Sequence, residues 1–169
     1  IVSKTDPKGV IEYANDYFVE ISGYSRDELI GTPHNILRHP DMPRIVFKMM
    51  WDRIKKSENI TALVKNLSKS GKYYWVVTEF ETKKDKRTRK IISYTAFRKA
   101  APRDAVEKII PIYKKLLALE SIGGMEASEK FLLDFLKENN TTYDDYIDTL
   151  IQNKGLFKMF FAAMRKLFK

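Results

Sequence analysis

The sequence predicts an α+β fold over its first hundred residues and an all-helical region after them. Apolar residues recur at helical spacing over residues 43–56, whereas from residue 60 they alternate with the spacing of a β-strand. Two turn signals, Ser70-Gly71 and the basic run 83–90, then separate three alternating segments, the last running from Ile91 to Arg98. Three antiparallel strands need a cover for their apolar face, which only the helices can supply. We therefore expect one unit over residues 1–100 and another over 101–169, divided near Pro102.

The elements that precede the sheet carry clear start and stop signals. Residues 10–14 follow the turn signal Asp6-Pro7-Lys8-Gly9 and are predicted to form a strand. Asn15 can cap a helix that ends at Gly23. Residues 25–28 have the sequence of a capping box, which predicts a short second helix that ends at Gly31.

The segment between this helix and the long one carries the most chemically loaded side chains. Arg38, His39 and Asp41 lie within four residues, bracketed by Pro40 and Pro43. Each proline favours extended geometry in the residue before it, and Pro43 also suits the first turn of the following helix. The segment is therefore predicted to be a stiff loop that enters a helix, a common setting for binding residues.

A polar residue interrupts an apolar strand face further along the chain. Asn66 shares its predicted face with Ile60, Ala62 and Val64. Its amide either bonds the backbone or a water, or bonds a ligand with an amide-like edge, and spacing alone does not choose between these. Tyr74 belongs to the inner face predicted for the next strand, where its hydroxyl can line a pocket.

The sequence contains little that indicates catalysis, metal binding or nucleic-acid binding. The chain has no cysteine, which excludes disulfides, thiolate metal sites and cysteinyl–flavin photochemistry. His39 lacks a spaced set of partner ligands, and no Ser/His/Asp order or phosphate-cradling glycine loop is present. The net charge of +9 owes much to residues 83–90, a run without aromatic residues that we interpret as a solvated hairpin loop rather than a phosphate-binding patch. Trp51, taken alone, fits a helix that faces the core.

The helical region after Pro102 contains two interruptions. Pro111 lies inside an apolar stripe and is expected to kink its helix, and Gly123-Gly124 is expected to break it. Three helical segments are predicted beyond, over 126–138, 142–152 and 155–168. The last has no acidic residue and a broad apolar face, as interfacial membrane helices do, but we favour packing on the rest of the protein or on a partner.

Taken together, these motifs resemble a known family. The carriers, in chain order, are Ala14-Asn15-Asp16, Ile21 to Tyr24, Glu28 to Gly31, Pro33-His34-Asn35, Arg38 to Pro43, Met50-Trp51, Val64-Lys65-Asn66 and Gly71 to Trp75. They resemble the PAS domain of Aer-type aerotaxis and energy-taxis receptors over about residues 1–99. The resemblance implies a five-stranded antiparallel sheet with short helices on one face, non-covalently bound FAD, and sensing of redox state rather than enzymatic activity.

The same resemblance implies which residues contact or shape the flavin site. The matching positions are Asn15, Arg38, His39, Asp41, Phe47, Trp51, Asn66 and Tyr74. Ile60 stands where these flavin domains often carry a tryptophan that would stack on the ring. Two alternatives stay open at this point: a cofactor-free PAS interaction module, and a haem PAS domain that uses His39.

The helical tail does not look like a membrane anchor followed by a long signalling coil. The chain instead resembles the small soluble sensor of a two-protein energy-taxis system. That likeness implies a bacterial, cytoplasmic protein that signals to a membrane chemoreceptor-type partner, with homodimerisation and peripheral contact with the inner membrane through residues 155–168 as further expectations, and no nucleic-acid partner.

Overall fold

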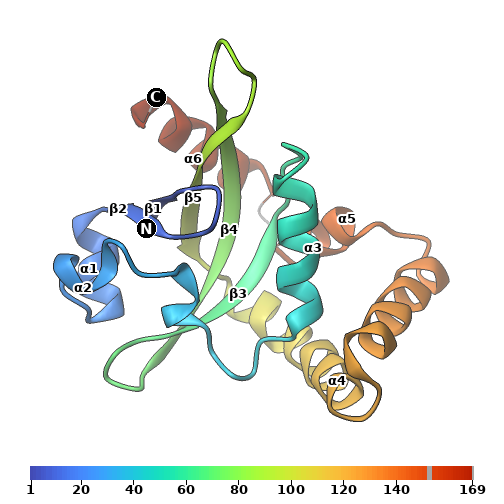
Figure 1. Ribbon diagram of the computed structural model, residues 1–169. Coiled ribbons are helices and arrows are strands. Elements are labelled where there is room, and N and C mark those ends of the chain that lie inside the picture. The colour runs from blue at the N-terminus through green and yellow to red at the C-terminus, as the bar shows by residue number, and fades with distance from the viewer. Residues whose placement is uncertain (152–153, 169) are drawn as a thin grey trace.

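A five-stranded antiparallel sheet forms the centre of the computed structural model, which describes residues 1–151 and 154–168 (Figure 1). Its strands lie in the order β2-β1-β5-β4-β3. In chain order the elements are β1 (Val2–Thr5), β2 (Ile11–Ala14), α1 (Asp16–Ser22), α2 (Arg26–Leu29), the 3₁₀ helix η1 (His34–Leu37), α3 (Arg44–Ile54), β3 (Ala62–Leu67), β4 (Tyr73–Lys84), β5 (Ile91–Ala100), α4 (Arg103–Glu138), α5 (Tyr143–Ile151) and α6 (Lys154–Leu167). The α+β class and the five-stranded sheet are confirmed.

One inner strand of the sheet, β1, is not revealed by periodicity. β1 pairs with β2 on one side and with β5 on the other, so that Ser3 lies opposite both Ala14 and Ala96. Because both of its faces are covered, its Val2 and Ser3 are buried alike and show no apolar–polar alternation. β3 also differs from expectation, since it begins at Ala62 and leaves Ile60 in the preceding segment.

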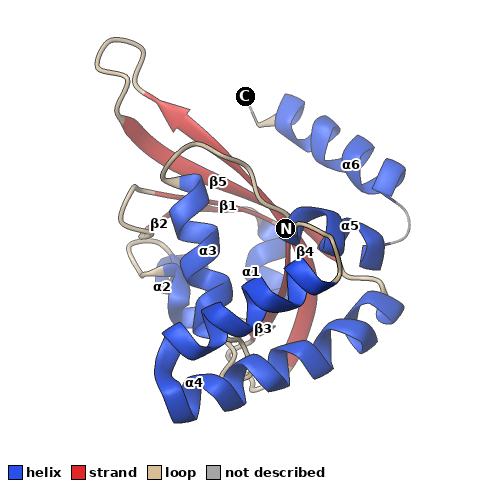
Figure 2. Ribbon diagram, turned by 90° about the vertical axis from the view of Figure 1, so that its right-hand side faces the viewer, coloured by secondary structure: helices blue, strands red, loops and turns tan. Residues whose placement is uncertain are grey.

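The predicted helix boundaries before the sheet hold to within two residues. The Asn15 side chain caps α1, and Gly23 ends that helix in the left-handed region. The capping box of α2 is complete, with Ser25 and Glu28 each accepting from the other's backbone N–H. These short helices, η1 and α3 cover one face of the sheet, which we call the inner face (Figure 2).

The helical tail packs against the sheet and α3 rather than standing apart from them. Its residues Ile109, Tyr113, Leu116 and Ile147 belong to the same buried cluster as the residues of α3 and β3. The Tyr113 hydroxyl donates to the carbonyl of Leu63 at 2.8 Å. The α4 ribbon turns back on itself at Gly124, whose φ of 71° and ψ of −172° leave the helical region, whereas helical dihedrals continue through Pro111. The tail thus has two α4 arms, 103–123 and 125–138, followed by α5; the last residue of the helix predicted over 142–152 lies outside the described residues.

α6 covers the outer face of the sheet (Figure 2). Its Phe157 and Phe161 are buried, and the Lys99 ammonium of β5 lies 4.7 Å from the ring centroid of Phe157. Arg165 pairs with Glu79 of β4. The outer face is therefore partly buried beneath the tail, as the packing interpretation of residues 155–168 expected. Among the described residues, no helix is both long enough and apolar enough to cross a membrane.

Candidate functional site

A cavity of about 410 Å³ lies between α3, the loop before it and the inner face of the sheet. Three kinds of residue line it: aromatic and aliphatic side chains of α3 and the strands, small residues of β1, β4 and the 6–9 turn, and a polar set from η1, β3 and β5. The lining residues are Ser3, Thr5, Lys8, Gly9, Pro33, His34, Asn35, Arg38, Phe47, Met50, Trp51, Ile54, Val64, Asn66, Thr78, Phe80, Tyr94, Ala96 and Arg98. A volume of this order suits the ring system of a cofactor.

One wall of the cavity carries a buried cation. Arg98 of β5 is 6% exposed and donates through Nη1 to Ser3 Oγ and through Nη2 to His34 Nε2, both at 2.9 Å. Because a guanidinium can only donate, Nε2 must be the unprotonated nitrogen of His34, which fixes the neutral imidazole with its proton on Nδ1. The guanidinium also lies 5.9 Å from the ring centroid of Phe18.

The charge balance of this wall is incomplete. Burial lowers the pKa of Arg98 to about 10, and burial together with the Arg98 charge lowers that of His34 to about 3. No carboxylate forms an ion pair with Arg98 anywhere in residues 1–151 or 154–168. A buried cation without an anion is costly, so this wall is complementary to a ligand that is anionic or presents acceptor atoms.

Arg38 and Phe47 form the part of the wall next to α3. The Arg38 guanidinium lies 4.7 Å from the ring centroid of Phe47, and its Nη2 donates to the carbonyl of Met42 at 3.3 Å. The backbone of Arg38 forms an isolated bridge with that of Asn66, which draws the loop onto β3. Three of the residues predicted from the resemblance, Arg38, Phe47 and Asn66, are thereby brought together at the cavity.

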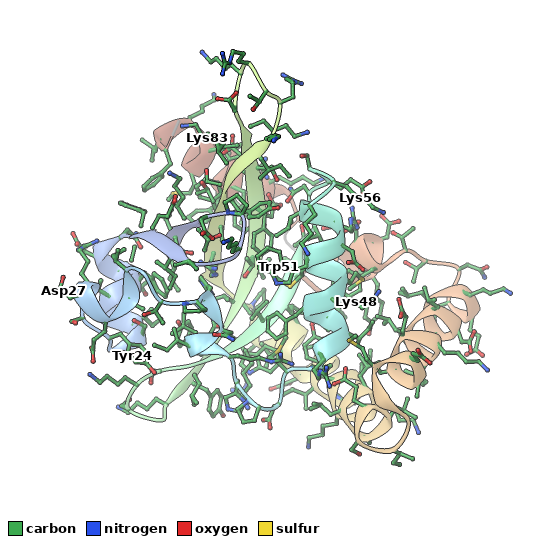
Figure 3. The ribbon with its side chains drawn as sticks, in the orientation of Figure 1. Tyr24, Asp27, Lys48, Trp51, Lys56 and Lys83 are labelled. Carbon is green, nitrogen blue, oxygen red and sulfur yellow. The ribbon has the colours of Figure 1, made fainter. Side chains whose placement is uncertain are left out.

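Trp51 supplies a flat surface in the same cavity. It lies on the side of α3 that faces the strands (Figure 3), with its ring edge-on to Tyr94 at 5.6 Å between centroids. Gly9, at φ +87°, approaches the indole so closely that a Cβ there would lie 3.0 Å from it. The glycine of the predicted 6–9 turn therefore makes room for this tryptophan.

Tyr74 lies opposite Asn66 in the pairing of β3 with β4, but it is not part of the cavity lining. Its hydroxyl is buried near Asn66 and Arg98 and makes no hydrogen bond of normal geometry to any described residue. Burial, the main cause, raises the pKa of Tyr74 to about 12. Thr78 Oγ1, in the cavity wall, is likewise buried without a partner among the described residues. Both are hydroxyl groups that a ligand or water can satisfy.

His39 and Asp41 lie on the outside of the loop, away from the cavity lining. Asp41 accepts from Lys65 Nζ at 2.6 Å, and His39 Nδ1 accepts from the Asp41 backbone N–H at 3.0 Å. The Lys65 ammonium in turn lies 4.1 Å from the ring centroid of Tyr73. The Lys65 ammonium is the first cause of the lowered pKa of the Asp41 carboxyl. His39 and Asp41 therefore help to hold the loop against β3 through the bond between Asp41 and Lys65.

Asn15 serves the fold at a distance from the cavity. Its Oδ1 accepts from Val2 N at 3.0 Å and from Phe18 N at 3.1 Å, which ties β1 to the start of α1. Ile60 also lies elsewhere: it is 1% exposed, joins the core shared with the tail and does not line the cavity. Its side chain is therefore not part of the wall that would face a bound ring.

Sequence reasoning missed the polar centre of the site. The sequence patterns indicate neither Arg98 nor His34 as a ligand contact, and they do not indicate Ser3 because β1 shows no alternation. Strand parity could have found Arg98, which shares the inner face of β5 with Tyr94 and Ala96. Within the described residues no group of three or more His, Asp and Glu side chains is arranged to hold a metal ion.

Comparisons with known proteins agree with this geometry. Residues 11–95 match the family described as the PAS fold. The chain is 42% identical over 118 residues to the aerotaxis receptor of Escherichia coli, covering 70% of this chain and 23% of the receptor. It is 28% identical over 94 residues to the biofilm dispersion protein BdlA of Pseudomonas aeruginosa, covering 54% of this chain and 22% of that protein. The chain thus spans less than a quarter of the length of either relative.

Solved structures show the same fold. The light-state structure of the LOV domain of the blue-light photoreceptor Aureochrome1 superposes with a TM-score of 0.58 at 20% identity, covering 65% of this chain and 88% of that chain. The dark structure of the same domain gives a TM-score of 0.57 at 24% identity, covering 65% and 81%. At these identities the likeness shows the fold alone.

Proposed function

Because the chain belongs to the PAS-fold family, we propose that it is a redox or energy-taxis sensor that binds FAD in the cavity beneath α3. The observation that carries the proposal is Arg98, a buried cation in the cavity wall with no carboxylate partner among the described residues. Similarity to the E. coli aerotaxis receptor supports a sensory rather than an enzymatic function.

The residues of the cavity fit a flavin ring. Trp51 and Phe47 offer flat apolar surfaces, and Asn66, which is 5% exposed, offers an amide that can match the amide-like edge of the ring. The Thr78 hydroxyl is buried without a partner in the described part of the chain and can bond a ligand atom. A bound flavin supplies electron-transfer chemistry and gains negative charge on reduction.

The protein's own part in sensing is electrostatic. Arg98 directs its N–H groups at Ser3 and His34. Negative charge in the cavity competes for these donors and for those of Arg38, so the hydrogen bonds of the wall rearrange. His34 stays neutral, because burial and Arg98 hold its pKa at about 3, and it remains available as an acceptor. A change of charge in the cavity therefore becomes a change in which partners Arg98 holds.

The other predicted site residues take supporting parts in this proposal. Asn15 fixes β1, which carries Ser3, against α1. His39 and Asp41 clasp the loop of Arg38 to Lys65 of β3, and Tyr74 contributes its buried hydroxyl beside Asn66.

For the whole protein, we place sensing in residues 1–100 and partner binding in residues 101–169. The proposed partner is a membrane chemoreceptor-type signalling protein, in keeping with the similarity to an aerotaxis receptor. We further propose a cytoplasmic location with peripheral contact to the inner membrane through residues 155–168, and self-association as a homodimer.

Reconstitution tests the cofactor directly. The purified protein is incubated with FAD, desalted and examined by visible absorption; retention of about one flavin per chain is the expected result. Arg38→Ala should lower retention, because it removes the donor stacked on Phe47, while Arg87→Ala in the exposed hairpin loop should not. A protein that stays colourless would reject the flavin proposal in favour of a cofactor-free interaction module. A haem spectrum would favour a haem PAS domain that uses His39, although His39 does not line this cavity.

A further inference from the structure

The N-terminus of α3 is capped by a residue more than seventy positions away in the chain. Pro43, the N-cap residue, provides no side-chain acceptor for the first turn. Instead the Glu120 carboxylate from the first arm of α4 accepts from Arg44 N through Oε2 and from Ile45 N through Oε1, both at 2.9 Å. A carboxylate at this position also complements the positive end of the helix dipole.

Both arms of the broken helix α4 contribute to this cap. Ser128 is fully buried in the second arm, and its Oγ lies 3.3 Å from Glu120 Oε1 and 2.9 Å from the carbonyl oxygen of Met125, so that its one hydroxyl hydrogen is shared between these two acceptors. The two residues come together because the helix turns back at Gly124, whose positive φ of 71° suits glycine. The Gly123-Gly124 break, which the sequence marks only as an interruption, therefore brings the arms together where the cap is made.

α3 is at once a wall of the cavity and the surface on which the tail lies. Phe47, under the Arg38 guanidinium, and Trp51 face the cavity. Lys48 lies on the opposite side of α3 from Trp51, toward the tail (Figure 3), and bonds Glu129 of α4 at 3.1 Å. Arg53 of α3 bonds Asp144 of α5. The capped turn, residues 44–47, also contains Phe47, so one turn of helix meets both Glu120 and the Arg38 stack.

We infer that Glu120 is a positioning residue that couples occupancy of the cavity to the docking of the α4 arms. A ligand that displaces Arg38 or Phe47 shifts the first turn of α3, and this shift alters the two N–H donors on which Glu120 depends. The coupling is reciprocal, so that docking of the arms changes ligand affinity by the same factor as the ligand changes docking. The identity of the ligand rests on the proposed function, but the coupling does not.

The test is a double-mutant cycle that needs no ligand. Hydrogen exchange of the second arm, residues 125–138, is measured in the wild-type protein, Phe47→Ala, Glu120→Ala and the double variant. Phe47→Ala is expected to speed exchange of this arm by roughly 5-fold or more with Glu120 present and by clearly less without it. Glu120→Gln, which keeps an acceptor, should restore part of the difference, and Glu126→Ala, an exposed glutamate in the same arm, should leave it intact. Phe47→Leu serves as the milder cavity variant should Phe47→Ala not fold.

Equal fold-changes with and without Glu120 would overturn the inference. Loading with FAD then provides an independent check, since Glu120→Ala should weaken the FAD-induced protection of residues 125–138 and also change FAD affinity. A protein that binds no FAD would reject the proposed function, while the cycle would still decide the coupling. A protein that binds FAD equally with and without Glu120, and shows an additive cycle, would retain the proposed function and lose the coupling.

Discussion

Replacing Arg98 by methionine separates a ligand-binding cation from a structural one. Methionine keeps much of the length and apolar volume of the side chain but removes its charge and all of its donors. In a protein that uses Arg98 to hold the fold together, this change would be severely destabilising. In one that keeps Arg98 for a ligand, the ligand-free protein should tolerate it.

The magnitude follows from the environment of the guanidinium. Burial lowers the pKa of Arg98 from its ordinary value to about 10, and a shift of this size corresponds to roughly 3 kcal/mol of unfavourable free energy for the charged form in the folded protein. Against this stand the hydrogen bonds to Ser3 and His34, each worth about 1.5 kcal/mol with a charged donor. The two contributions nearly cancel. In addition, Ser3 Oγ and His34 Nε2, 3.3 Å apart, can bond each other once Arg98 is gone.

We therefore expect Arg98→Met to change the free energy of unfolding of the ligand-free protein by less than ~1 kcal/mol, and to weaken FAD binding by roughly 10- to 150-fold. Urea unfolding followed by circular dichroism gives the first quantity, and FAD titration followed by fluorescence gives the second. Lys99→Met is the matched control, because Lys99 is the next residue of β5 and faces α6 on the other side of the sheet. A loss of ~3 kcal/mol or more in the ligand-free protein, or unchanged FAD affinity, would refute this account of Arg98.

Three further substitutions test other parts of the structure. His34 has a pKa of about 3 in the folded protein against 6.5 in the unfolded chain, so between these values the unfolded state binds more protons. The free energy of unfolding of the wild type should therefore fall by up to about 1.4 kcal/mol per pH unit as pH drops from 6.5 toward 3. His34→Gln should flatten this slope in urea unfolding at pH 7 and 4.5, and an equal slope in the variant would show that His34 does not cause it. Asn15→Ala should cost about 1–2 kcal/mol of unfolding free energy through the lost cap, with FAD affinity unchanged; a selective loss of FAD would instead make Asn15 a ligand contact. Tyr113→Phe should cost ~1–3 kcal/mol by leaving the buried Leu63 carbonyl unpaired, whereas Tyr73→Phe, at a 61% exposed residue, should cost less than ~0.5 kcal/mol; equal losses would show that the Tyr113 bond does not anchor the tail.

The sequence predicts this fold best where the physical cause is local. The capping box at Ser25 and the helix from Asn15 to Gly23 depend on residues within one or two turns, and the structure has them as predicted. The alternation along β4 also places Thr78 and Phe80 correctly on the inner face, since side-chain direction in a strand follows from the backbone alone.

What local pattern cannot supply is the effect of distant segments. β1 lies between β2 and β5 with Val2 and Ser3 both buried, so its sequence shows no alternation, and a reading that misses β1 also misses Ser3 as the partner of Arg98. Among the site residues that the resemblance implies, some line the cavity and others do not, and the difference again depends on contacts between distant segments. Arg38 and Asn66 meet through a bridge between the loop and β3, while Asp41, only three residues from Arg38, lies on the outside of that loop.

The tail shows the same limit most clearly. Periodicity predicts its helices, and Gly123-Gly124 predicts the break between the two arms of α4. Nothing in the local sequence indicates that Glu120 caps α3. That contact depends on the packing of α4 beside α3, which brings together residues 75 and 76 positions apart.

The measurement that tests the central claim most directly is the visible absorption spectrum of the full chain after incubation with FAD and removal of free flavin, recorded beside Arg98→Met and Lys99→Met. We expect a flavin spectrum for the wild type and Lys99→Met, and little or none for Arg98→Met although that variant is folded. A colourless wild-type protein, or a folded Arg98→Met that retains as much flavin as the wild type, would contradict it.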